Sequence, residues 1–151
     1  MGVAGSNPRG GEAGSSAAGG WRASIPSEFS AGRDVQDRIL ADLRRNGFST
    51  DTTFAIRIAL EEAMVNAIKH GNGGDPAKMV HVEANVTPQR AQITIEDEGP
   101  GFDRSAIPNP TAGPHLSKPS GRGILLIETY MDGVEWSNGG RRLTMVKHNA
   151  S

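Results

Sequence analysis

The sequence contains no cysteine, and this absence excludes several kinds of chemistry. A chain without thiols forms no disulfide bond, binds no zinc through thiolates and uses no cysteine nucleophile. Long hydrophobic runs are also missing, because the longest, ILLI at 124–127, is far shorter than the ~20 residues of a membrane-spanning helix. The sequence shows no basic start followed by an apolar segment, as a secretory signal would have. We therefore expect a cytoplasmic protein that does not enter a membrane.

Neither sign of charge is in excess, since 16 basic residues stand against 17 acidic ones and the net charge is −1. Direct binding to nucleic acid is not expected, because it relies on a surplus of lysine and arginine. A chain of 151 residues suits one domain, which can bury a core without cross-links.

The first 20 residues are mainly glycine, alanine and serine and carry almost no large side chain. Such a segment buries too little apolar surface to offset the entropy that it loses on ordering. We expect a disordered leader at 1–20, one domain at 21–148 and a short tail at 149–151.

Apolar residues at helical spacing predict helices at 31–46, 50–70 and 123–133. Ser49 or Thr50 is suited to cap the second helix, and Gly71 to end it. This helix has two apolar stripes, which predicts burial on two sides. The stripes consist of Ile56, Leu60, Ala63 and Ala67, and of Phe54, Ile58 and Val65.

The hydrophobic period changes to two in MVHVEANV at 79–86 and in AQITIED at 91–97. Each strand buries one face only, which favours an antiparallel sheet with helices on a single side. An extended start at 21–28 and a final hairpin around Asn138-Gly139 complete the order β-α-α-β-β-loop-α-β-β. The predicted fold is a two-layer α/β sandwich with a mixed, mostly antiparallel sheet.

The second helix carries a file of polar residues, Glu62, Asn66 and His70, beside its apolar stripe. A carboxylate there is placed to act as a general base, and an amide oxygen one turn later is a suitable ligand for Mg²⁺. Lys69 or His70 would then face phosphate. The alternative is that these groups only solubilise the helix and cap a neighbouring loop.

Two glycine-containing segments offer a second and third part of a site. In DEGPGFD at 97–103, Asp97 ends a strand and can accept a hydrogen bond from an exocyclic amine, while Gly99 and Gly101 let backbone approach a ligand. The alternative is an ordinary acidic turn. In SGRGI at 120–124, exposed N–H groups at a helix start suit phosphate, and Arg122 either adds charge or points to water. This segment is neither a P-loop nor a dinucleotide-binding fingerprint.

The connection between these two segments is long and rich in glycine and proline. Its prolines prevent a regular element, and its glycines provide hinges. We expect residues 102–120 to form a mobile lid over the phosphates.

Taken in order, EAMVN, DEGPG and GRG resemble the N, G1 and G2 boxes of the GHKL ATPase superfamily over residues 21–148. NAIKHGN, DEGPGFD and PSGRGILLIETYMD together are similar to the bacterial anti-sigma-factor serine kinases. The resemblance implies the Bergerat ATP-binding fold with ATP and Mg²⁺ as cofactors. The resemblance implies that Glu62, rather than Glu61, is the general base and that Asn66 is the Mg²⁺ ligand. It places Asp97, with Gly99 and Gly101, at adenine, Thr144 at a water near adenine, and Gly121 and Gly123 at the phosphates. Lys69 and His70 match polar positions whose roles vary within the family.

The function expected from this resemblance is that of an ATP-Mg²⁺-dependent serine/threonine kinase. It would act as an anti-sigma factor, with a sigma factor and an anti-anti-sigma (STAS-type) protein as partners. Some relatives carry an arginine where this chain has Pro119, which keeps open an ATP-gated binding module without kinase activity. The ATP-binding half of a histidine kinase is disfavoured, because residues 1–50 have room for only one helix. The oligomeric state stays open, with a homodimer among the options.

Overall fold

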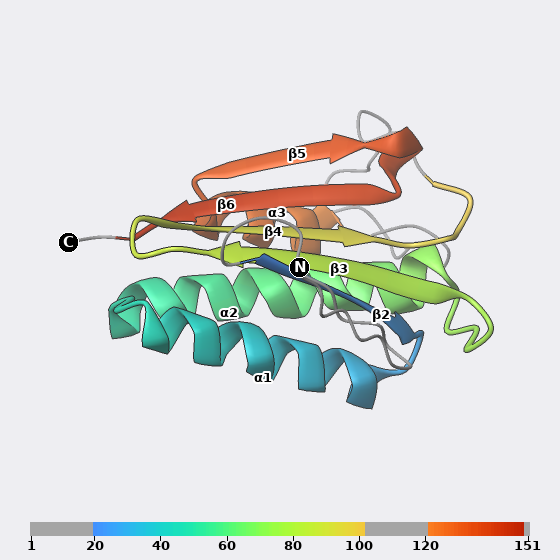
Figure 1. Ribbon diagram of the computed structural model, residues 1–151. Helices are drawn as coiled ribbons and strands as arrows, with labels where there is room; N and C mark the ends of the chain where they lie inside the picture. Colours follow the sequence, from blue (N-terminus) through green and yellow to red (C-terminus); the bar gives the residue numbers. More distant parts are fainter. Residues whose placement is uncertain (1–19, 102–120, 150–151) are drawn as a thin grey trace.

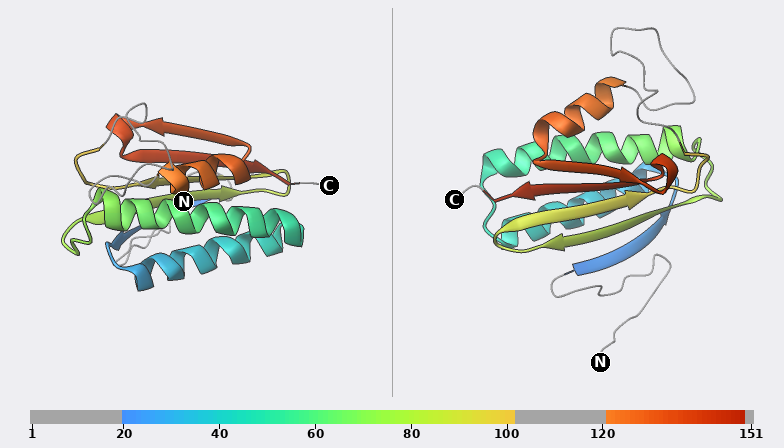
Figure 2. Two further views of the ribbon diagram at one scale, coloured as in Figure 1. Left: turned by 180° about the vertical axis from the view of Figure 1, so that it is seen from behind. Right: turned by 90° about the horizontal axis from the view of Figure 1, so that it is seen from above.

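A computed structural model describes residues 20–101 and 121–149. The predicted lid at 102–120, and the predicted leader apart from Gly20, lie outside this range. Within it, a five-stranded sheet and three α-helices form two layers (Figures 1 and 2). The strands are β2 (Gly20–Pro26), β3 (Met79–Val86), β4 (Arg90–Glu96), β5 (Gly133–Ser137) and β6 (Arg142–His148). The helices are α1 (Phe29–Arg45), α2 (Thr50–Val65) with the π-helical η1 (Asn66–Gly71), and α3 (Gly121–Tyr130); the 3₁₀ turn η3 (Asn138–Gly140) joins β5 to β6.

The sheet has the order β2-β3-β4-β6-β5, and each of its pairings is antiparallel. The parallel component that the sequence allowed for is therefore not seen in the part of the chain described. Alternate residues of every inner strand face the helices, as the period of two predicts. The buried set on β3, for example, is Val80, Val82, Ala84 and Val86.

The edge strand β2 is attached to α1 by the side chain of Trp21. Its indole N–H donates a 2.7 Å hydrogen bond to Asp42 Oδ2, and the Arg38 guanidinium lies 3.9 Å from the ring centroid. A buried indole N–H needs a partner, and Asp42 supplies it from the adjacent helix. The contact thus holds the edge strand of the sheet against the helix layer.

Helix α2 occupies the predicted range but changes form before it ends. Ser49 caps it, accepting a 3.1 Å hydrogen bond from Thr52 N. From Asn66 onward the helix widens into the π-helical η1, a change that no spacing in the sequence predicted. The expected burial on two sides is wrong at Phe54, whose side chain is 53% exposed, whereas the stripe containing Leu60 is buried.

Asn72, directly after η1, connects three segments of the chain. Its Nδ2 donates to Ser27 Oγ at 2.8 Å and to the Met79 carbonyl at 3.0 Å, and its Oδ1 accepts from Glu98 N at 2.8 Å. The side chain is almost fully buried, so both ends of its amide find their hydrogen-bond partners within the protein. Asn72 thus fixes the end of η1 against the end of β4.

No helix in the described part of the chain is long and apolar enough to span a membrane.

We predict that Asn72→Ala lowers the free energy of unfolding by about 2–4 kcal/mol, because it leaves buried donors and acceptors without partners. Urea unfolding would measure the change. Asn46→Ala is the matched control, since the Asn46 side chain makes one hydrogen bond, to the Asp42 carbonyl at 2.8 Å. Its loss should be only about 0.5–1.5 kcal/mol. Equal losses for the two variants would contradict the connecting role of Asn72.

Candidate nucleotide-binding site

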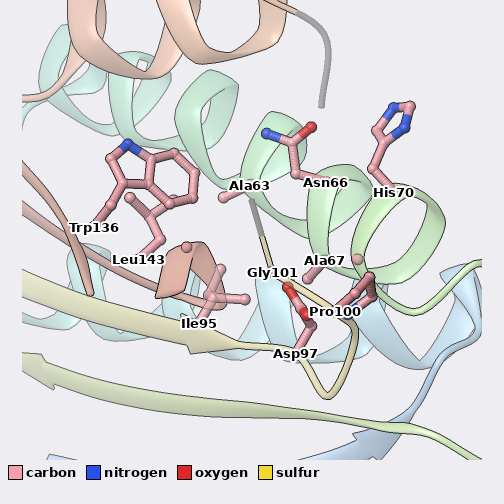
Figure 3. A pocket seen from close by; sticks show the side chains of 12 residues that line it. Ala63, Asn66, Ala67, His70, Ile95, Asp97, Pro100, Gly101, Trp136 and Leu143 are labelled. Atoms are coloured by element: carbon pink, nitrogen blue, oxygen red, sulfur yellow. The ribbon is translucent and has the colours of Figure 1, made fainter. Parts of the chain in front are cut away.

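A pocket lies between the helix layer and the carboxyl end of β4 (Figure 3). Its lining comes from α2 and η1, from the end of β4 and the following turn, and from the β5–β6 hairpin. The residues that matter most for its chemistry are Asn66, His70, Ile95, Asp97, Trp136 and Leu143. The structure thereby brings together segments that lie far apart in the sequence.

Asp97 enters the pocket because the chain approaches itself very closely at two glycines. A Cβ atom on Gly71 would overlap the Asp97 carboxyl, and one on Gly99 would overlap the Gly71 carbonyl oxygen. Asp97 Oδ1 accepts a 2.8 Å hydrogen bond from Gly99 N. Burial raises the pKa of Asp97, while the Gly99 N–H and Arg141 oppose the shift. In its ionised form this carboxylate is a hydrogen-bond acceptor in a largely apolar setting.

Arg141 holds the glycine turn in place. Its Nε donates to the Gly99 carbonyl at 2.7 Å and its Nη2 to the Pro100 carbonyl at 3.1 Å. Gly101 has a φ of +81° and packs so tightly that a Cβ atom would collide with the Gly139 carbonyl oxygen. Sequence reasoning missed Arg141, because nothing in the pair of arginines at 141–142 indicates which one faces the turn.

Glu62 and Asn66 lie beneath the start of α3. A Cβ atom on Gly123 would be 2.9 Å from Glu62 Oε1 and 3.8 Å from Asn66 Oδ1, so both side chains lie directly against the start of α3. Partial burial, with Glu61 as a smaller cause, raises the pKa of Glu62. Asn66 is only 8% exposed, and its buried Nδ2 has no hydrogen-bond partner among the residues described. The predicted N segment, which contains Glu62 and Asn66, therefore meets the predicted G2 segment at 121–123.

His70 also lines the pocket, as the polar file predicted, whereas the exposed Lys69 does not. The buried Nδ1 of His70 has no partner in the described part of the chain. Burial, and next Lys69, lower the pKa of His70, so the neutral imidazole is favoured. A neutral ring offers one donor and one acceptor to a polar ligand.

Thr144 does not line the pocket. Its neighbours on β6, Leu143 and Met145, face the helices, so Thr144 is on the opposite face of the sheet, 3.3 Å from Thr94 Oγ1. Leu143, not Thr144, lines the pocket. A role for Thr144 beside adenine therefore has no support in this geometry. Of the G2 residues, Arg122 is exposed and Gly121 is the first residue of α3.

The residues described contain no cluster of three or more His, Asp or Glu side chains that would hold a metal by themselves. Mg²⁺ does not require one, because it keeps most of its waters and takes one or two protein oxygens beside substrate phosphates. The amide oxygen of Asn66, which lies beneath the start of α3, is an oxygen ligand of this kind.

The chain is similar to known proteins over most of its length. Residues 25–147 match the family described as the histidine kinase-like ATPase domain. An anti-sigma F factor of Clostridium perfringens is 37% identical over 98 residues, which cover 61% of this chain and 69% of that protein. An anti-sigma F factor of Oceanobacillus iheyensis is 36% identical over 88 residues, covering 56% and 60%. The serine-protein kinase RsbW of the same organism is 29% identical over 100 residues, covering 62% and 63%.

The chain thus spans less than two thirds of the length of both Oceanobacillus proteins. A solved Mycobacterium tuberculosis structure with RsbU and RsbW domains superposes with a TM-score of 0.58 and 16% identity, covering 86% of this chain and 32% of the other. At that identity it shows the fold alone. Because the family match extends over well more than half of the chain, the protein belongs to the histidine kinase-like ATPase domain family, and this membership implies binding of ATP.

Proposed function

We propose that this chain is an ATP-Mg²⁺-dependent protein serine/threonine kinase that acts as an anti-sigma factor. The observation that carries the proposal is the convergence of Glu62, Asn66 and the start of α3 beside a pocket that contains Asp97. Phosphoryl transfer from an adenine nucleotide needs a general base, a metal ligand and a seat for the phosphates, which Glu62, Asn66 and the start of α3 would supply from the helix layer. Asp97 would supply the hydrogen-bond acceptor for adenine from the sheet.

Asp97 would read the base. Its ionised carboxyl accepts a hydrogen bond from the exocyclic amine of adenine, and the keto group of guanine leaves it without a donor. Apolar side chains around it, including Ala63, Ile95 and Leu143, exclude water and strengthen this contact.

The phosphates would lie at the start of α3. Backbone N–H groups at 121–123 and the positive end of the helix dipole favour negative charge there. Asn66 would hold Mg²⁺ through its amide oxygen, and the bound ion would neutralise phosphate charge. His70 is placed to contact the polar part of the nucleotide from η1.

Glu62 would act as the general base toward a serine hydroxyl of a partner protein. As its carboxylate takes the hydroxyl proton, the serine oxygen bonds to the γ-phosphorus and the bond to the β-phosphate oxygen breaks, releasing ADP. The raised pKa of Glu62 makes its carboxylate a stronger base than an ordinary glutamate. Backbone N–H groups of α3 stabilise the charge that develops on the phosphoryl oxygens.

The proposed partners follow from the names of relatives, two of which are anti-sigma F factors and one a serine-protein kinase. We propose a sigma factor as the inhibited protein and an anti-anti-sigma (STAS-type) protein as the phosphorylated one, both in the cytoplasm. Pull-down from the native cytoplasm with and without ATP identifies them. Nucleotide-dependent capture of a protein that is never phosphorylated would instead favour an ATP-gated binding module.

Selection of adenine should depend on Asp97. With Mg²⁺ present, ATP should bind more tightly than GTP. Asp97→Asn should weaken the binding of ATP roughly 10- to 100-fold and reduce the preference for ATP over GTP, because a charged acceptor is lost. Calorimetric titration of both nucleotides gives the ratio. Asp75→Asn is a suitable control, since the exposed Asp75 side chain lies outside the pocket and accepts a 2.9 Å hydrogen bond from Ala77 N. Equal affinities of the unaltered protein for ATP and GTP would refute the assignment.

Substitutions of Glu62 and Asn66 should differ in kind. Glu62→Ala should leave ATP affinity nearly intact and slow phosphoryl transfer ~10²-fold or more, because the attacking hydroxyl is absent from the ATP complex. Asn66→Ala should weaken both binding and transfer, because a metal ligand serves ground state and transition state alike. Each should cost only about 1 kcal/mol of stability.

These variants are tested by nucleotide titration beside a phosphorylation assay with a candidate anti-anti-sigma protein. Glu61→Ala serves as the control, because the Glu61 side chain is exposed next to Glu62. Full transfer activity in Glu62→Ala would place the base elsewhere. A loss of ATP affinity in Glu62→Ala as large as that in Asn66→Ala would make Glu62 a metal or structural residue.

A further inference from the structure

We propose that Trp136 forms the aromatic wall of the pocket and packs against the base of the bound nucleotide, so that it contributes affinity that does not depend on the exocyclic amine. The inference rests on the proposed binding of ATP in this pocket. It assigns a role in affinity to a residue that the sequence motifs do not include.

The sheet register places Trp136 on the inner face of β5. Trp136 pairs with Leu143 of β6, and both line the pocket. In Figure 3 the indole ring lies beside Leu143 and extends toward Ala63 of α2, on the other side of the pocket from His70. Asp97 rises from the sheet between these two sides. A base bound to Asp97 therefore has a large aromatic surface beside it.

Trp136 is less buried than the residues that it faces in the pocket. Neighbouring inner residues are closed off from solvent, with Leu143 at 3% and Ala63 at 2% exposure, whereas Trp136 is only partly buried at the edge of the core. Partly exposed indole surface within a pocket favours a planar apolar partner. The small side chains of Ala63 and Ala67 on the opposing helix leave space for such a partner.

The two tryptophans of the chain have different environments. Trp21 is buried and hydrogen-bonded to Asp42, far along the sheet on the opposite edge strand. Trp136 is the aromatic residue of the pocket. A nucleotide that packs on Trp136 should therefore change the fluorescence of one known side chain, which a purely structural tryptophan would not show.

Titrations with ATP and with inosine triphosphate, both with Mg²⁺, test the proposal. Inosine carries a keto group in place of the amine, so its binding reports packing without the Asp97 contact. Trp136→Ala should weaken the binding of both nucleotides by a similar factor, roughly 5- to 150-fold, which is the range for a lost base–aromatic contact. Asp97→Asn should weaken ATP far more than inosine triphosphate.

Conservative variants separate packing against the base from packing within the fold. Trp136→Phe should keep most of the affinity and lose the fluorescence change on binding, because the remaining Trp21 is remote. Trp136→Leu should keep the core filled and lose affinity for both nucleotides. Val134→Ala is the matched control, because Val134 lies on the same inner face of β5 but does not line the pocket. The affinity of this variant for both nucleotides should equal that of the unaltered protein.

Wild-type affinity in Trp136→Leu, or a nucleotide-dependent fluorescence change that persists in Trp136→Phe, would overturn the role of Trp136. Either result would leave the Asp97 assignment and the proposed kinase intact. Failure of the unaltered protein to bind ATP at all would instead overturn the proposed function, and with it this inference.

Discussion

The close contact between Gly71 and Gly99 is the constraint on which the site depends. The helix layer and the sheet layer meet there backbone to backbone, with the Asp97 carboxyl between them. A side chain at Gly99 would push η1 away from the end of β4, and a side chain at Gly71 would displace the Asp97 carboxyl. Asn72 reinforces the contact from the next position through its hydrogen bond from Glu98 N. Two glycines and one buried amide thus set the distance between the two layers.

The π-helical form of η1 belongs to the same arrangement. Its wider turn is closed by bonds such as Asn72 N to the Ala67 carbonyl at 2.9 Å, which span five residues rather than four. The widening begins at Asn66 and ends at Gly71, so the residue proposed to ligate Mg²⁺ and the close contact lie at its two ends. Single π turns inside α-helices occur often at functional sites. Here the π turn keeps His70 at the pocket while it carries the chain to the sheet.

Much of this architecture was predictable from local pattern. The alternation in 79–86 gave β3 with its observed bounds. The glycines at 99 and 101 were predicted to let backbone approach a ligand, which stays a prediction; the structure shows that each lies against the backbone of another segment. The π turn and Arg141 were not predictable, because they depend on contacts between distant segments. Thr144 is a different case, since the apolar neighbours Leu143 and Met145 already indicated that it faces away from the helices. There the family resemblance outweighed the alternation, which was the better guide.

The site divides its tasks between the two layers. The groups proposed for base recognition lie on the sheet, at Asp97 and on the inner faces of β4, β5 and β6, whereas the groups proposed for phosphate chemistry lie on α2 and at the start of α3. Burial raises the pKa of a carboxyl on each side, Glu62 on the helices and Asp97 on the sheet. In the proposed function the N-terminus of α3 and a cation held by Asn66 would attract the phosphates. A nucleotide bound across the pocket would therefore join the layers and stabilise the folded state in proportion to its affinity.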